Sequence, residues 1–299
     1  MRIQHLNAIS TCPIGGAFMD GRTGGLRGRL ACHCLLVEAP GGLVLVDTGL
    51  GLRDVAAPTR RLSRLFLALL RPELREEMTA VRQIERLGYE ASDVRHVVLT
   101  HLDFDHAGGL DDFPEATVHL LAEERDDATA QRTLLDRMRY RPQQWSTAPR
   151  WRVYARGEGE PWLGFDAVRD LEGLPPEILF VPLVGHTRGH AGVAVRGAHG
   201  WLLQAGDAYF FHAEMDPDLP RCPPGLRLYQ ALMEKDRGAR LWNRDRLRAL
   251  RREHGGEVTI TCGHDAVEFE RLAGRPLETP APPRYLRPVP RPAEDHVRR

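Results

Sequence analysis

Four side chains of types that bind metal ions lie within six residues of one another, in the run THLDFDHAGG at residues 100–109. They are His101, Asp103, Asp105 and His106, and they come directly after an apolar stretch. Imidazole nitrogens and carboxylate oxygens bind zinc and other divalent ions. A single histidine in a polar loop is usually structural, but this density of ligand types after a strand predicts a metal site.

Four other segments have the same form, an apolar run that ends in a potential ligand or an acid. These segments are residues 45–49, 184–190, 203–207 and 260–265. Their candidate ligands are His186, Asp207 and His264, whereas we expect Asp47 and His190 to orient ligands from behind. Because a strand end delivers its side chains to the edge of a sheet, these segments together predict one shared site.

The elements that must position these residues follow from the apolar patterning. The predicted strands are 2–9, 34–37, 43–46, 94–100, 178–182, 191–195, 201–205 and 258–262. The predicted helices are 60–70, 76–87, 121–130, 131–138, 226–235 and 241–253. Two groups of strands with helices between and around them indicate a two-sheet α/β sandwich.

Length and composition are those of one large domain that is not adapted to binding nucleic acid or a membrane. The chain has 299 residues, and 41 basic residues balance 41 acidic residues, so nothing indicates nucleic acid or a membrane surface as a partner. Five cysteines without a CxxC pair, and no signal-peptide pattern, favour a cytoplasmic, soluble protein. We expect a catalytic domain over residues 1–277 and a Pro- and Arg-rich tail over 278–299.

Taken in order, the motifs resemble the metallo-β-lactamase superfamily. The matching motifs are Asp47-Thr48-Gly49, HxDxDH at 101–106, GHTxGH at 185–190, Gly206-Asp207 and Gly263-His264. The flanks HLDFDHAGGL and CGHD are most similar to the N-acyl-homoserine lactonase branch. The resemblance implies a four-layer αβ/βα sandwich and two divalent metal ions, zinc first, with iron, manganese or cobalt as alternatives.

The resemblance also implies how the ligands are divided between the ions. Site one would comprise His101, Asp103 and His186; site two would comprise Asp105, His106 and His264; and Asp207 would bridge both ions. The family pattern is usually HxHxDH, so Asp103 stands where a histidine is expected. A carboxylate there adds negative charge, which favours harder metals such as iron. A di-iron oxidoreductase is therefore an alternative function.

The chemistry that these ions would support is hydrolysis by a metal-bridging hydroxide. We expect lactones or related esters as substrates, with phosphotriesters, phosphodiesters or aryl esters as alternatives, and a homodimer is compatible with the sequence. Asp105 or Asp207 would pass a proton to the leaving group. Related lactonases often bind the substrate carbonyl with a tyrosine one position after Tyr209, so Tyr209 is a candidate, as is His212. Segments 60–70 and 139–151 would either roof the site or pack in the core.

Overall fold

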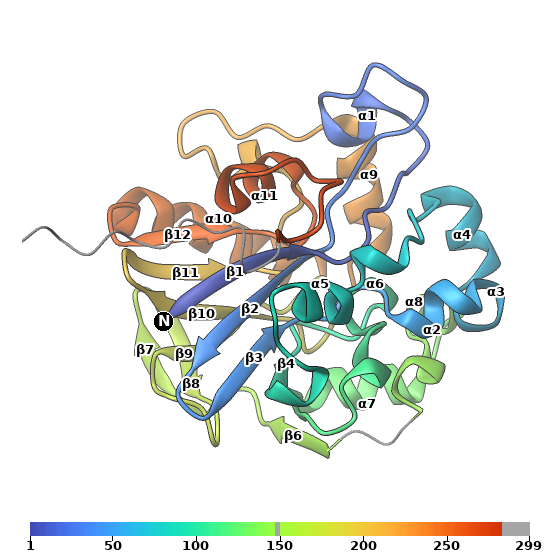
Figure 1. Cartoon of the computed structure of the whole chain (residues 1–299). Coiled ribbons are helices and arrows are strands. Elements are labelled where there is room, and N and C mark those ends of the chain that lie inside the picture. Colours follow the sequence, from blue (N-terminus) through green and yellow to red (C-terminus); the bar gives the residue numbers. More distant parts are fainter. Residues whose placement is uncertain (147–149, 283–299) are drawn as a thin grey trace, which may run out of the picture.

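The structure is a computed structural model, and it describes residues 1–146 and 150–282. Figure 1 shows two sheets side by side, with helices around them. The strands are β1 (Arg2–Asn7), β2 (His33–Ala39), β3 (Gly42–Val46), β4 (Val94–Val98), β5 (Thr117–Leu121), β6 (Arg150–Tyr154), β7 (Glu160–Trp162), β8 (Phe165–Asp170), β9 (Ile178–Pro182), β10 (Ala191–Gly197), β11 (Gly200–Gln204) and β12 (Val258–Thr261).

Helices connect these strands and cover the outer faces of the sheets. The α-helices are α1 (Ala17–Asp20), α2 (Leu52–Ala56), α3 (Pro58–Arg61), α4 (Arg64–Leu70), α5 (Ala80–Arg86), α6 (Phe104–Ala107), α7 (Ala122–Ala130), α8 (Leu134–Arg139), α9 (Pro224–Met233), α10 (Arg237–His254) and α11 (Ala266–Ala273). Short 3-10 turns are η1 (Glu76–Met78), η2 (Ala91–Asp93), η3 (Leu110–Asp112), η4 (Pro142–Trp145) and η5 (His212–Met215).

Each sheet has six strands among the described residues. The first has the order β1-β2-β3-β4-β5-β6, and the second has the order β12-β11-β10-β9-β8-β7. In the first sheet, β3, β4, β5 and β6 run parallel, so the chain leaves β3 and β4 at the same edge. In the second sheet, β11 and β12 are parallel neighbours, and their ends also meet at one edge.

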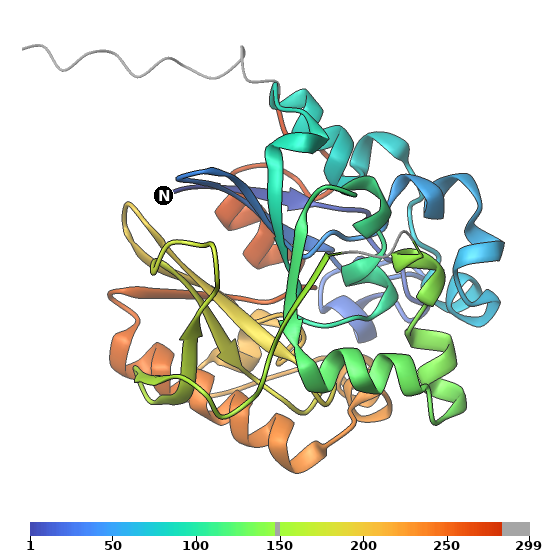
Figure 2. The ribbon, with the colours of Figure 1, turned by 90° about the horizontal axis from the view of Figure 1, so that it is seen from below.

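Three apolar clusters account for the four layers. Side chains of β2, β3 and β4 pack against side chains of β9 and β10, and this cluster fills the space between the sheets. Leu247 and Leu250 of α10 pack on the outer face of the second sheet, and Val81 and Ile84 of α5 pack on the outer face of the first. Figure 2 shows α10 and α5 on opposite sides of the molecule with the strands between them. The predicted αβ/βα sandwich is confirmed.

Most predicted elements are present, and their differences from the structure are local. The predicted strand 178–182 has the observed bounds of β9, whereas the predicted helix 60–70 is broken into α3 and α4. The break lies at Leu62, which has an extended backbone and whose side chain is buried. Burial of Leu62 therefore interrupts a pattern that is helical in sequence. β5 to β8 and α11 lacked a pattern strong enough to be predicted.

The end of the chain packs further than we expected. Our boundary between domain and tail fell at residues 277 and 278, yet Ala281 is buried in the first core cluster and its backbone N–H donates to Gln83. The rest of the predicted tail, residues 283–299, lies outside the described residues. No helix of the described ranges is long and apolar enough to cross a membrane.

A buried histidine in the first sheet predicts how stability depends on pH. His119 lies between His96 and the Tyr154 hydroxyl, and burial, followed by the charges of His96 and Arg152, lowers its pKa to about 3. In the unfolded chain His119 therefore binds a proton below about pH 6.5, whereas in the folded chain it stays neutral. The free energy of unfolding therefore falls as the pH falls. Between pH 7 and pH 5 this group removes about 2 kcal/mol from the free energy of unfolding.

Urea unfolding of the His119→Gln variant at the two pH values measures this contribution. The variant is expected to lose about 2 kcal/mol less than the wild-type protein on acidification. The exposed His199 provides the control, since His199→Gln also removes one histidine but leaves the buried contacts of His119 intact. Equal losses in wild type and His119→Gln would contradict the assignment.

Candidate metal centre

All predicted ligands lie in segments that follow strand ends at one edge of the sandwich, and two of them, Asp105 and His106, lie in the short helix α6. The loop after β4 carries the 101–106 motif, the loop between β9 and β10 carries His186, and the turns after β11 and β12 carry Asp207 and His264. These residues are all buried, with at most 7% of their surface exposed. Backbone hydrogen bonds tie the loops together, for example from Ala191 to Thr100 and from Gly263 to Gly206.

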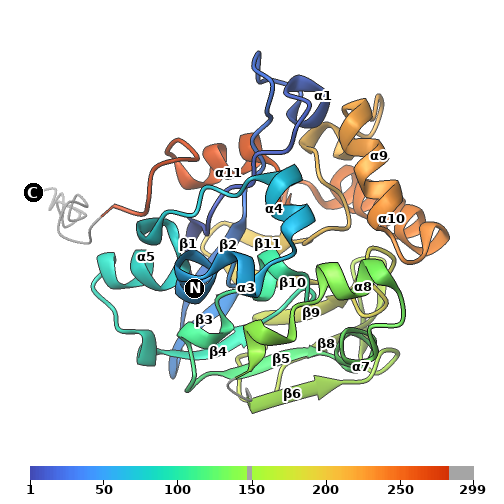
Figure 3. The ribbon, with the colours of Figure 1, turned by 90° about the vertical axis from the view of Figure 1, so that its right-hand side faces the viewer.

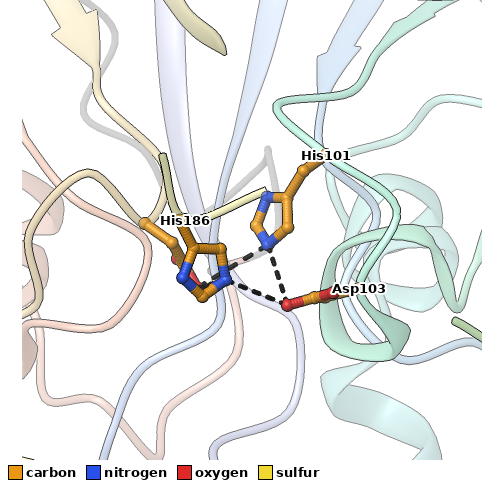
Figure 4. A group of neighbouring side chains, drawn as sticks. His101, Asp103 and His186 are labelled. Atoms are coloured by element: carbon orange, nitrogen blue, oxygen red, sulfur yellow. Dashed lines mark hydrogen bonds and ion pairs between the residues drawn. The ribbon is translucent and has the colours of Figure 1, made fainter. Parts of the chain in front are cut away.

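The first cluster consists of His101, Asp103, His186 and Asp207. Figure 4 shows that the side chains of His101, Asp103 and His186 point toward one another. The Asp103 Oδ2 atom lies 3.3 Å from His101 Nε2 and 3.0 Å from His186 Nε2. The Asp207 Oδ2 atom lies 3.6 Å from His101 Nε2 and 3.3 Å from His186 Nε2.

The second cluster consists of Asp105, His106 and His264, and Asp207 again lies beside it. The two Nε2 atoms of His106 and His264 are 3.4 Å apart. The Asp207 Oδ1 atom lies 3.3 Å from the first of these and 3.2 Å from the second. Asp105 Oδ2 is 3.8 Å from His264 Nε2. Asp207 Oδ2, which faces the first cluster, also lies 3.2 Å from His264 Nε2, so Asp207 is shared by both clusters.

These distances suit divalent ions. A tetrahedral zinc ion with bonds of about 2.0 Å separates its ligand atoms by about 3.3 Å. Two buried atoms at the cluster, His101 Nε2 and Asp207 Oδ1, have no hydrogen-bond partner. Burial, followed by the neighbouring His106, lowers the pKa of His101 well below its ordinary value, so its ring is neutral and its nitrogen is free to bind. The donor set therefore fits two metal ions.

Polar residues behind the clusters fix the ligand orientations. Asp47 accepts from the backbone N–H and hydroxyl of Thr100, and it lies 2.9 Å from His106 Nδ1. The Nδ1 atom of His264 lies 2.7 Å from the carbonyl oxygen of Ala31. His190 does not face the clusters with a free nitrogen, because Asp207 donates its backbone N–H to it. These contacts agree with the orienting roles expected for Asp47 and His190.

Asp103 has a partner that the sequence did not reveal. Arg139, the last residue of α8, donates from Nε to Asp103 Oδ1 at 2.6 Å and from Nη2 to Asp103 Oδ2 at 2.5 Å. Burial alone would raise the pKa of Asp103, but the guanidinium and the imidazoles outweigh burial and hold that pKa well below its ordinary value. Nothing in the local sequence distinguishes Arg139 from its neighbours Arg137 and Arg141.

Glu124 is a second residue that the sequence did not single out. It lies in α7 and is fully buried. One carboxylate oxygen accepts from the Leu102 backbone N–H at 2.9 Å, and the other accepts from the Gly189 backbone N–H at 3.1 Å. A single side chain thus joins the two loops that carry His101 and His186.

The structure does not bring Tyr209 to the metal ligands. Its hydroxyl donates to Glu268, and its ring is buried in the core outside the second sheet. The next residue, Phe210, faces the site instead, with its ring 5.0 Å from the His264 ring and 5.7 Å from the His186 ring. We therefore withdraw Tyr209 as a substrate-facing residue. His212 is held by Asp265, 2.8 Å from its Nδ1 atom.

Tyr229 of α9 supplies a hydroxyl on this side of the site. Its ring lies 5.9 Å from the Phe210 ring. Burial and then the nearby carboxylates of Asp105, Asp103 and Asp207 raise the pKa of Tyr229 well above its ordinary value. No hydrogen bond of this hydroxyl is found within residues 1–146 and 150–282. No sequence motif predicts a role for Tyr229, because it lies on a helix outside the motifs that carry the ligands.

Two ligand clusters that share one carboxylate, at one edge of a four-layer sandwich, define a candidate dinuclear metal centre. The family model of the metallo-beta-lactamase superfamily matches residues 27–264, and the chain belongs to this superfamily. This fold implies divalent metal ions, and the His and Asp clusters are where they would bind.

Relatives support a hydrolase. A protein of Mycobacterium tuberculosis, named a probable metallo-hydrolase, is 45% identical over 236 residues, which are 79% of this chain and 75% of that protein. An N-acyl homoserine lactonase of Bacillus thuringiensis is 26% identical over 195 residues, 64% of this chain and 69% of the lactonase. These relatives confirm the predicted resemblance to the lactonase branch.

Solved structures agree on the fold. An N-acyl homoserine lactone hydrolase, with the product N-hexanoyl-L-homoserine bound at its catalytic metal centre, aligns with a TM-score of 0.67 and 20% identity. The alignment covers 90% of this chain and 95% of that one. At this level of identity the likeness establishes the architecture and leaves the substrate to other arguments.

The contacts of Glu124 predict the effect of removing one acceptor. In Glu124→Gln an amide N–H group would face one of the two backbone N–H groups, which would then be buried without a partner. We expect a loss of about 1–3 kcal/mol in the free energy of unfolding and weaker retention of metal. Asp126→Asn, on the exposed side of the same helix, is the control and should change stability by less than about 0.5 kcal/mol. Equal stability of the two variants would argue against the role of Glu124.

Proposed function

We propose that the protein is a dinuclear metal-dependent hydrolase of lactones or related esters. The observation that carries this proposal is the placement of Asp207, whose carboxylate lies within 3.3 Å of ligand nitrogens in both clusters. His101, Asp103 and His186 would hold one ion, and Asp105, His106 and His264 the other. Two divalent ions there, zinc first, would activate water at neutral pH and polarise an ester carbonyl.

Side chains of the protein would hold the two ions in place and transfer the proton to the leaving group. Asp207, which lies beside both clusters, would be a ligand shared by the two sites. Asp105 is buried beside His264, and burial, the largest influence on it, raises its pKa above the ordinary value. A carboxylate at this place could pass a proton to a leaving alkoxide, and we assign this role to Asp105.

Tyr229 would hold the substrate carbonyl in place of Tyr209. Its ring lies 5.9 Å from the ring of Phe210, which faces the ligands, and its hydroxyl has no hydrogen bond to a described residue. A phenol in that position can donate a hydrogen bond to an oxygen that gains negative charge during the reaction. Phe210, which carries no hydroxyl, would contribute only an apolar surface.

An apolar rim beside the site suits a substrate with an acyl chain or an aryl group. Phe66 of α4 packs against Phe104 of the metal-binding loop, with ring centres 5.0 Å apart. Exposed apolar side chains continue from there over α4, α9 and the segment around α1. They are Phe18, Leu26, Leu65, Leu69, Leu228 and Leu232. Figure 3 shows α1, α4 and α9 at the same end of the molecule, in agreement with Figure 1.

The segment 139–151 does not form such a rim in its described part. Tyr140 is fully buried in the first core cluster, and Trp145 and Trp151 pack against that cluster. Residues 147–149 lie outside the described residues. Of the two segments that we considered as a roof, the helix α4 is therefore the one that supports an apolar substrate.

The substrate class is tested by comparing rates on metal-loaded protein. We expect kcat/KM for a long-chain acyl-homoserine lactone to exceed that for an aryl phosphotriester by at least about 100-fold. Removal of metal with a chelator, or Asp207→Ala, should abolish the activity. A preference for the phosphotriester would assign phosphoryl transfer instead. Slow turnover of both by protein with two bound ions would reject both hydrolase assignments.

The role of Tyr229 is tested against Tyr209 as a matched control. Tyr229→Phe should lower kcat/KM for the lactone by about 10- to 100-fold, because it removes a donor to the reacting oxygen. Tyr209→Phe should leave kcat/KM within about threefold and lower only the stability, because its hydroxyl binds Glu268 in the core. Both variants should keep their metal content. The reverse pattern of activities would return the role to Tyr209.

A further inference from the structure

Asp103 and Arg139 form an ion pair that is sealed from water. The Arg139 side chain is 0% exposed and the Asp103 side chain 5% exposed. Beyond its two bonds to Asp103, the guanidinium donates from Nη1 to the Met233 carbonyl oxygen at 2.6 Å and from Nη2 to His186 Nε2 at 2.8 Å. Each of its three nitrogens is thus engaged by the protein, so Arg139 is not free to bind substrate.

The two oxygens of Asp103 have different neighbours. Oδ2 lies within 3.3 Å of the Nε2 atoms of both His101 and His186, which places it among the ligand atoms of the first cluster. Arg139 binds both oxygens, since Oδ1 accepts from its Nε and Oδ2 accepts from its Nη2, but Oδ1 has no ligand nitrogen beside it in these contacts. Because a planar guanidinium grips a carboxylate with two parallel bonds, it fixes the rotation of Asp103 about its side-chain bonds. One oxygen of Asp103 is thereby presented to the cluster.

The pair also balances charge. The ligand set contains three carboxylates, those of Asp103, Asp105 and Asp207. Their formal charge of −3 becomes −2 when Arg139 is included, and −2 is the charge that two carboxylates and a neutral imidazole at position 103 would have. Arg139 therefore offsets the extra charge that comes with Asp103.

The backbone holds Arg139 in this position. Tyr140, the next residue, forms an antiparallel bridge with Asp103. The side chain of Thr133 caps the start of α8, and Lys235 forms ion pairs with Asp136 of α8 and with Asp127 of α7. The partner of Asp103 is therefore placed by a short, capped helix that is fixed at both ends.

We infer that Arg139 is a positioning residue that works as one unit with Asp103, directing a single carboxylate oxygen into site one and cancelling its charge. This inference rests on the proposed dinuclear centre. It predicts that the histidine usual in the family would not function at position 103 of this chain. Installing the usual family ligand, with Asp103→His alone, would leave a buried guanidinium without its counter-ion beside a divalent ion, and site one should then fail.

The experiment compares wild type, Asp103→His and the double variant Asp103→His/Arg139→Met. Metal content is measured by elemental analysis after dialysis, and the affinity for the second ion by competition with a chromophoric chelator. Asp103→His should bind the second ion at least about 100-fold more weakly than wild type, because an unpaired buried charge remains. The double variant should recover two ions per chain, with an affinity within about tenfold of wild type.

Arg61 provides the matched control. It is a buried arginine that binds Asp54 at 2.7 Å and Asp111 at 3.0 Å, in another part of the molecule. Asp103→His/Arg61→Met should stay as weak in binding the second ion as Asp103→His. If Asp103→His is not recovered folded, recovery of a folded, two-metal protein by the Arg139→Met change carries the same meaning.

The outcomes separate the inference from the proposed function. If Asp103→His binds both ions as tightly as wild type, or the double variant binds no better than Asp103→His, the coupling of Asp103 with Arg139 is wrong while the dinuclear centre stands. If the wild-type protein binds fewer than two ions, both the centre and the inference are overturned. A rescue by Arg61→Met equal to that by Arg139→Met would show a general effect of charge removal and would also overturn the inference.

Discussion

The gathering of three carboxylates and four imidazoles in one buried space is the constraint on which the rest of the structure depends. Buried like charges repel one another, and each carboxylate loses its hydration, so such a cluster needs cations and hydrogen-bond donors to persist. Asp47 fixes His106, Glu124 joins two of the loops, and Arg139 supplies a positive charge. The divalent ions that the fold implies would complete the balance.

The sandwich serves this cluster by bringing strand ends together. The parallel neighbours β3 and β4 end at one edge, as do β11 and β12, so ligands that are far apart in sequence converge there. The cluster between the sheets holds the two edges at a fixed separation. Asp207, which follows β11 of the second sheet, contacts His101 and His106, which follow β4 of the first sheet, and thereby joins the two halves of the fold.

The sequence was sufficient for the features that are encoded locally. Ligands such as His101 and His264 follow apolar strands directly, so both the strand and the ligand could be read in one short window. Arg139, Glu124 and Tyr229 lie on helices, and only tertiary packing brings them to the site. The expectation for Tyr209 failed because the turn after Asp207 points Phe210, and not its neighbour, toward the metal ligands.

The ion pair of Asp103 and Arg139 also changes the argument about the metal. A carboxylate in place of an imidazole adds negative charge and a hard oxygen donor, both of which favour iron or manganese over zinc. The guanidinium of Arg139 offsets the added negative charge, so that the total charge is the one an imidazole at position 103 would give. It does not remove the hard oxygen donor, since Oδ2 of Asp103 still faces the cluster. Donor hardness at a single position is a weaker bias than donor hardness and charge together. The five remaining ligands besides Asp103 and the shared Asp207 include four imidazoles, which suit zinc as well as iron, and for this reason we propose a zinc hydrolase before a di-iron oxidoreductase.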